Sequence, residues 1–94
     1  MIRIEHRELL DCPFLICDGC GRKITDADNA IVTWGESRVP RYLHKIKCDD
    51  RTDSCWIPLR EHLAFLLHNS GLKTFTVRTE LKKYRDTWGD TDAA

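Results

Sequence analysis

The sequence contains no long hydrophobic run, and no stretch reaches the roughly 18 consecutive apolar residues that a membrane-spanning helix needs. Its first residues, MIRIEHRELLD, mix charged and apolar side chains without an uninterrupted apolar region, so we expect no signal peptide. Internal repeats and low-complexity segments are absent as well. These absences predict a cytoplasmic protein without membrane contact, with one domain over residues 1–88 and a flexible tail at 89–94.

The chain also has no excess of charge of either sign, because its 15 basic side chains balance 15 acidic ones. The field of the whole molecule therefore cannot attract nucleic acid or an anionic membrane, although local patches still can. The hydrophobic fraction, 41%, is slightly below the globular norm of about 45–50%. We expect a modest core that a bound metal ion would help to stabilise.

Several patterns typical of catalytic sites are missing from the sequence. The chain has no His-Glu-x2-His motif and no deaminase pattern of His-x-Glu with Cys-x2-Cys, and it lacks the paired histidines and asparagine of HNH nucleases. Glu61 and His62 are neighbours on a predicted helix, so their side chains point in different directions and belong to a solvated face. We predict that the protein is not an enzyme, and we expect no small-molecule substrate.

What the sequence does contain is five cysteines, an odd number that argues against a disulfide framework in a chain without a secretion signal. Cys17 and Cys20 stand in the run CDGCG, where glycines permit the sharp turn that lets both thiols reach one ion. A redox dithiol is the alternative, but thioredoxin-like motifs precede a helix, whereas a hairpin is expected here. Cys12, which precedes Pro13, is expected to be a small buried side chain.

The pattern of apolar residues predicts an α+β order of strand, cysteine turn, hairpin, helix and helix. The expected elements are short strands within 1–11 and 14–16, a hairpin of residues 30–34 and 39–46, and helices at 56–69 and 76–88. Pro40 makes the second hairpin strand edge-like. The second helix, with Thr76 as its N-cap, is expected to close the core through one apolar stripe. That stripe consists of Val77, Leu81, Tyr84 and Trp88.

A complete metal site needs a second pair of ligands beside Cys17 and Cys20, and two pairs are available. One is His44 with Cys48, which requires a bend over residues 45–47, because four residues of straight strand span about 13 Å. The other is Cys48 with Cys55, which would place Cys55 at a helix N-terminus, where a thiolate is favoured. The residues alone leave both open, and the ligand types favour Zn²⁺ over iron.

The layout of Cys17-x2-Cys20, hairpin, His44-x3-Cys48 and helix resembles a treble-clef or LIM-like zinc finger. The runs CDGCGRKI and YLHKIKCDD are also similar to those of small uncharacterised bacterial and phage zinc-finger proteins, and the resemblance covers residues 14–69. It implies a small zinc-stapled domain in which Cys17, Cys20, His44 and Cys48 bind a structural Zn²⁺, with Cys55 as the alternative to His44. The chain departs from the LIM pattern, which has two residues between the His and the Cys and a second zinc site.

Two local basic patches suggest possible partners. Residues 38–47 carry four basic side chains and no acidic one, and residues 72–85 carry five basic side chains against Glu80. A nucleic-acid surface would use the following residues of the hairpin and second helix: Arg41, Lys45, Arg78, Lys82 and Arg85. A charged outer helix face explains the same pattern without nucleic acid. We predict a non-enzymatic interaction module or adaptor that binds another protein, with Trp34 as candidate anchor, and keep a small DNA- or RNA-binding regulator as the alternative.

Overall fold

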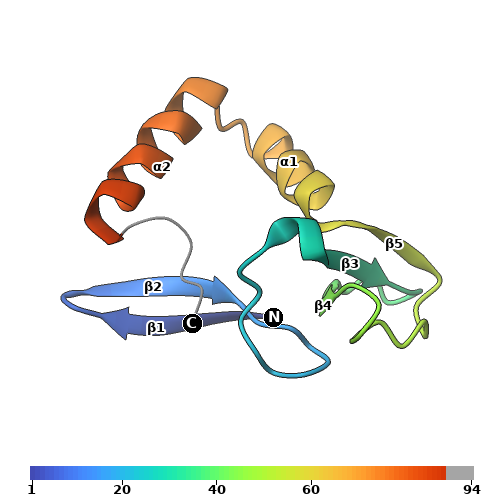
Figure 1. Cartoon of the computed structure of the whole chain (residues 1–94). Coiled ribbons are helices and arrows are strands. Elements are labelled where there is room, and N and C mark those ends of the chain that lie inside the picture. Colours follow the sequence, from blue (N-terminus) through green and yellow to red (C-terminus); the bar gives the residue numbers. More distant parts are fainter. Residues whose placement is uncertain (89–94) are drawn as a thin grey trace.

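The computed structural model describes residues 1–88 and confirms an α+β protein with two antiparallel sheets and two α-helices (Figure 1). The tail expected at residues 89–94 lies outside the described residues. In chain order the elements are β1 (Ile2–Arg7), β2 (Leu10–Leu15), the short 3-10 helix η1 (Ala27–Asn29), β3 (Ala30–Trp34), β4 (Arg41–His44), β5 (Cys55–Pro58), α1 (Leu59–Asn69) and α2 (Thr74–Trp88). Within residues 1–88, no helix is long and apolar enough to cross a membrane.

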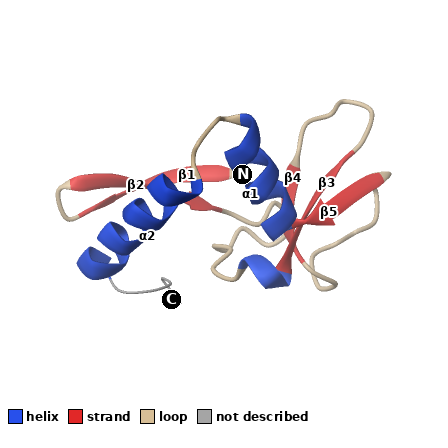
Figure 2. Ribbon diagram, turned by 90° about the horizontal axis from the view of Figure 1, so that it is seen from above, coloured by secondary structure: helices blue, strands red, loops and turns tan. Residues whose placement is uncertain are grey.

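The first sheet is a hairpin of β1 and β2, which lies at the opposite end of the molecule from the second sheet (Figure 2). The sequence predicts an interruption at Cys12 and Pro13, but β2 runs through both of them and Pro13 pairs with Ile4. A two-stranded ribbon has only edge strands, so it tolerates a proline that lacks a backbone donor. Glu8, with φ of 53°, forms part of the tight connection between the strands.

The second sheet has the strand order β4-β3-β5, with β3 antiparallel to both neighbours. The hairpin of β3 and β4 is confirmed, although β4 is shorter than the expected segment 39–46. The predicted helix start at Trp56 is wrong, because Trp56 pairs with Thr33 in β5 and α1 begins at Leu59. Pro58 explains the difference, since the residue before a proline is driven into extended backbone.

The core divides into two clusters on opposite faces of β3. Ala30 and Val32 point toward α1 and are fully buried in a cluster that includes Leu59. Ile31 points the other way and packs with Cys17 and Leu43. This division follows from the alternation of side chains along a strand. The strand therefore connects the core beneath α1 to the core beneath the cysteine turn.

The expectation that the second helix closes the core is wrong. Leu81 is 55% exposed and Tyr84 is 46% exposed, and α2 takes no part in the main contacts that join η1, β3 and β5 to α1. One face of the central sheet is already covered by α1 and the other by the cysteine turn, which leaves no apolar sheet face for α2. The helix also begins at Thr74, two residues before the predicted cap Thr76. The radius of gyration, 14.3 Å, accordingly exceeds the roughly 12 Å of a fully packed chain of this length.

Candidate metal centre

The turn that carries Cys17 and Cys20 is held by its own backbone. The N–H of Cys17 donates to the carbonyl of Arg22 at 2.8 Å, and the N–H of Gly21 donates to the carbonyl of Cys17 at 2.9 Å. Gly21 has φ of +75°, a left-handed conformation that glycine adopts without strain. Gly19 is needed for another reason, because a Cβ there would lie 3.0 Å from Cys48 Cβ and 3.2 Å from its carbonyl oxygen.

The other two side chains come from the end of β4 and the bend that follows it. The strand ends at His44, and residues 45–47 form a turn in which Ile46 has φ of 61°. The N–H of Lys45 donates to the carbonyl of Asn29 at 3.0 Å and fixes the start of this turn. The bend that a His44–Cys48 pair requires is therefore present, and it returns Cys48 toward the cysteine turn.

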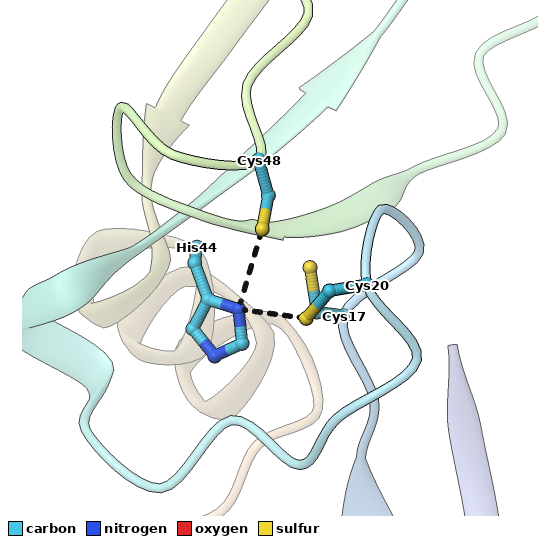
Figure 3. Close-up of side chains that lie close together, drawn as sticks. All are labelled: Cys17, Cys20, His44 and Cys48. Atoms are coloured by element: carbon cyan, nitrogen blue, oxygen red, sulfur yellow. Dashed lines mark hydrogen bonds between the residues drawn. The ribbon is translucent and has the colours of Figure 1, made fainter.

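Four potential ligand atoms converge at this point, from Cys17, Cys20, His44 and Cys48, as Figure 3 shows. All four atoms lie within 4.8 Å of one another. Nδ1 of His44 faces the thiols and lies 3.4 Å from Cys20 Sγ and 3.7 Å from Cys48 Sγ. A tetrahedral zinc site with Zn–S near 2.3 Å and Zn–N near 2.0 Å has ligand-to-ligand edges of about 3.5–3.8 Å. The group therefore has the size and the donor set of a closed metal site.

The thiols of the cluster differ in their tendency to lose a proton. Burial opposes ionisation of Cys17, but N–H groups of Cys20, His44 and Gly19 stabilise its thiolate and lower its pKa to about 6. The Gly19 N–H donates to Cys17 Sγ at 3.3 Å. For Cys48, burial and then the neighbouring Cys17 and Cys20 sulfurs raise the pKa to about 11. A divalent cation among the sulfurs would reverse this repulsion and favour the thiolate form of each cysteine.

The structure does not bring Cys55 into the cluster. Cys55 pairs with Trp34 at one end of β3, whereas His44 pairs with Ala30 at the other end, about 13 Å away along the strand. Cys55 is exposed, and it lies in β5 rather than at the N-terminus of a helix as one alternative required. Cys12, expected to be buried, is half-buried in β2.

Asp18 is a residue of the site that the sequence reasoning did not identify. Its backbone N–H donates to the carbonyl of Tyr42 at 2.7 Å, and its Oδ2 accepts from the N–H of Tyr42 at 2.8 Å. These bonds attach the cysteine turn to β4. The only sequence signal was an acidic residue inside the Cys-x2-Cys turn, where carboxylates often bond to nearby backbone groups.

The five basic residues considered for nucleic-acid binding do not share one environment. Arg41 forms ion pairs with Asp50 at 3.0 Å and Asp53 at 3.4 Å, so it holds the loop before β5 in place. Lys45 is half-buried in the bend beside the cluster. The others are exposed on α2: Arg78, Lys82 and Arg85. The structure therefore places Arg41 in the ion pairs of a loop, Lys45 beside the cluster and the other three residues on an exposed helix.

The candidate anchor Trp34 is half-buried against the core cluster beneath α1, whereas Trp56 on β5 is 62% exposed.

Comparisons with protein-family models, curated proteins and solved structures found no match for this chain. The interpretation of the cluster accordingly depends on its geometry and donor set.

Proposed function

We propose that Cys17, Cys20, His44 and Cys48 bind one structural Zn²⁺ and that the protein is a non-enzymatic interaction module. The observation that carries the proposal is the convergence of four ligand atoms from two separate chain segments with edges that fit a tetrahedron. Thiolate and imidazole ligands in this number favour zinc over harder cations. Four protein ligands fill the coordination shell, which leaves no position for a catalytic water.

The zinc ion would stabilise the fold by joining the cysteine turn to the end of the hairpin. Cys17 is buried against Ile31 and Leu43, and Cys48 packs on the same cluster. The order of cysteine turn, hairpin and helix supports the treble-clef interpretation. The chain differs in that β5 stands between the second ligand pair and α1, so α1 contributes no ligand.

The interaction surface we propose consists of exposed apolar side chains on the two helices. Phe65 of α1 is 59% exposed, and Phe75 of α2 is 80% exposed. Leu66, Leu72 and Leu81 add further exposed apolar area on the same two helices and their connection. These exposed large apolar side chains would be covered by a protein partner, which supports the proposal.

Native mass spectrometry tests the metal proposal directly. We expect one zinc ion per chain, and Co²⁺ in its place should give the visible absorption of tetrahedral thiolate coordination. Cys48→Ser should lose the metal, whereas the matched control Cys55→Ser should retain it. A folded wild-type chain that binds no metal would contradict the proposal.

Affinity capture from the cells that produce the protein tests the interaction surface. We expect a partner that binds the wild-type chain and the control Lys82→Ser but not the double variant Phe65→Ser/Phe75→Ser. All three proteins should hold equal amounts of zinc. The same set of captured proteins from the double variant would overturn the assignment of this surface.

The alternative, a small DNA- or RNA-binding regulator that uses the hairpin and α2, has one observation in its favour. Arg78 and Lys82 are exposed and occupy neighbouring positions, four residues apart on α2. Arg41 gives it no support, because its guanidinium is held by Asp50 and Asp53. Salt-dependent nucleic-acid binding that Arg78→Gln/Lys82→Gln abolishes would favour this alternative.

A further inference from the structure

A hollow of about 800 Å³ lies beside the cysteine–histidine cluster. Cys20, His44 and Cys48 form part of its wall, so one side of the proposed metal centre faces into it. Among the described residues, its lining includes five cationic side chains and no acidic one. These are Arg3, Arg22, Lys23, Lys45 and Lys47. Such a concentration of one charge stands out in a chain whose formal net charge is zero.

Two of the five cations already form ion pairs with one acid. Arg3 Nη2 lies 2.9 Å from Glu5 Oε2, and Lys23 Nζ lies 3.0 Å from Glu5 Oε1. The remaining three come from the far side of the cysteine turn and from the bend after β4. Within the part of the chain that the structure describes, the side chains of Arg22, Lys45 and Lys47 form no ion pair.

Charge balance with a zinc site does not account for these cations. Zn²⁺ with three thiolates and a neutral histidine carries one negative charge, and Glu5 carries another. Even with Arg3, Lys23 and Glu5 set aside, the charge of the metal centre offsets only one of the three charges of Arg22, Lys45 and Lys47, which leaves a net charge of about +2 around the hollow. Three cationic side chains in one concave site are suited to bind anionic oxygens.

The other side chains of the hollow exclude two kinds of ligand. Sites for small organic molecules are lined mainly by apolar and aromatic side chains, whereas His44 supplies the only ring among the residues that line this hollow. A base would therefore find no aromatic face on which to stack. A cubic space of this volume is about 9 Å wide, so a duplex, whose major groove alone is roughly 12 Å wide, is too wide to enter it.

The geometry points to a site for the phosphate backbone of a single-stranded nucleic acid, held by Arg22, Lys45 and Lys47 beside the metal centre. Such contacts neutralise phosphates without reading bases, so binding is independent of sequence and sensitive to salt. This site lies apart from the proposed partner surface on the helices. It depends on the proposed zinc ion only in that the metal fixes Cys20, His44 and Cys48 in one wall.

Fluorescence anisotropy with a labelled oligothymidylate and the zinc-loaded full chain tests the assignment. With three phosphates neutralised, the logarithm of the association constant should fall against the logarithm of salt concentration with a slope of about −2. Lys47→Gln and Arg22→Gln should each weaken binding at low salt and reduce the slope to about −1.4. Arg51→Gln, in the exposed loop before β5 and outside the hollow, is the matched control and should bind as the wild-type chain does.

Each variant is first assayed for bound zinc by native mass spectrometry. A variant that has lost the metal is replaced in the test by Lys45→Gln. Equal weakening by Arg51→Gln and Lys47→Gln would overturn the inference, since it would show only general electrostatic attraction. Tighter binding of the duplex, or full competition by inorganic phosphate at the same phosphate concentration, would overturn the assignment to a single strand. Absence of binding by a chain that holds one zinc ion would overturn this inference and leave the metal proposal intact.

Discussion

Asp18 and Tyr42 are joined by two hydrogen bonds of opposite direction, with N···O distances of 2.7 and 2.8 Å. Asp18 lies between Cys17 and Cys20, and Tyr42 lies two residues before His44 on β4. The pair therefore sets the separation between the two halves of the cysteine–histidine cluster.

Replacement of Asp18 should weaken both the fold and the metal centre. Asp18→Ala leaves the N–H of Tyr42 without its acceptor, which should cost about 1.5–3 kcal/mol for a bond to a charged group. Asp18→Asn keeps an oxygen at this position and should cost less. Urea unfolding of the zinc-loaded proteins measures the difference, and equal midpoints for wild type and Asp18→Ala would show that the turn is held by other contacts.

Gly19→Ala should be destabilising because its Cβ meets Cys48 at 3.0 Å. Relief of this contact moves Cys48 away from the cluster, and overpacking of this kind costs about 1–3 kcal/mol. Gly35→Ala is the control, since a Cβ there makes only an ordinary contact of 3.4 Å with Asp53. We expect competition with a chromophoric chelator to show weaker zinc retention for Gly19→Ala alone.

The contact between buried Tyr42 and half-buried His62 should make stability depend on pH. Tyr42 Oη lies 3.2 Å from His62 Nε2, and burial lowers the pKa of His62 below its usual 6.5. The unfolded chain then binds the proton more readily, so this contribution to stability is complete above about pH 6.5 and declines as the pH falls toward the folded pKa. Urea midpoints across this range should show a smaller decline in His62→Gln, while His68→Gln on the exposed end of α1 should follow the wild type.

A second pH effect is expected at lower pH from the loop before β5. The Arg41 guanidinium, followed by hydrogen bonds from Thr52, holds the pKa of Asp50 well below its usual value of 3.8. The stabilisation is present above about pH 4 and is lost as the pH falls through the folded pKa. Because Asp50 is exposed, the effect should be small. Asp50→Asn should lack this acid-dependent loss, whereas Glu36→Gln should retain it.

Substitution on α2 distinguishes a core helix from an exposed one. Leu81→Ser should change the free energy of unfolding by less than about 0.5 kcal/mol, because Leu81 is 55% exposed. Leu59→Ala removes a side chain that is 1% exposed beneath α1 and should cost about 2–5 kcal/mol. Similar losses for the two variants would mean that α2 packs on the core.

The sequence was informative where a local pattern and its tertiary setting agree. The β-branched residues of β3 correctly predicted the hairpin, whereas the bend after it was the requirement of one of two ligand pairs that the sequence left open. The start of α1 was mispredicted because Trp56 fits a helical repeat, while pairing with β3 and the restriction before Pro58 favour a strand. The position of α2 was mispredicted because an apolar stripe shows that a helix has a face to cover, not which surface covers it.

The alternation of side chains along β3 should determine which part of the chain unfolds locally first. Ile31 belongs to the cluster of the cysteine turn, and its neighbour Val32 belongs to the cluster beneath α1. Loss of the proposed zinc ion would loosen the first cluster while the second remains covered, so the metal-free chain would exchange amide protons early in the cysteine turn and late in α1. The strand β3 would then form the boundary between the cysteine-turn cluster, which opens without zinc, and the cluster beneath α1, which stays closed.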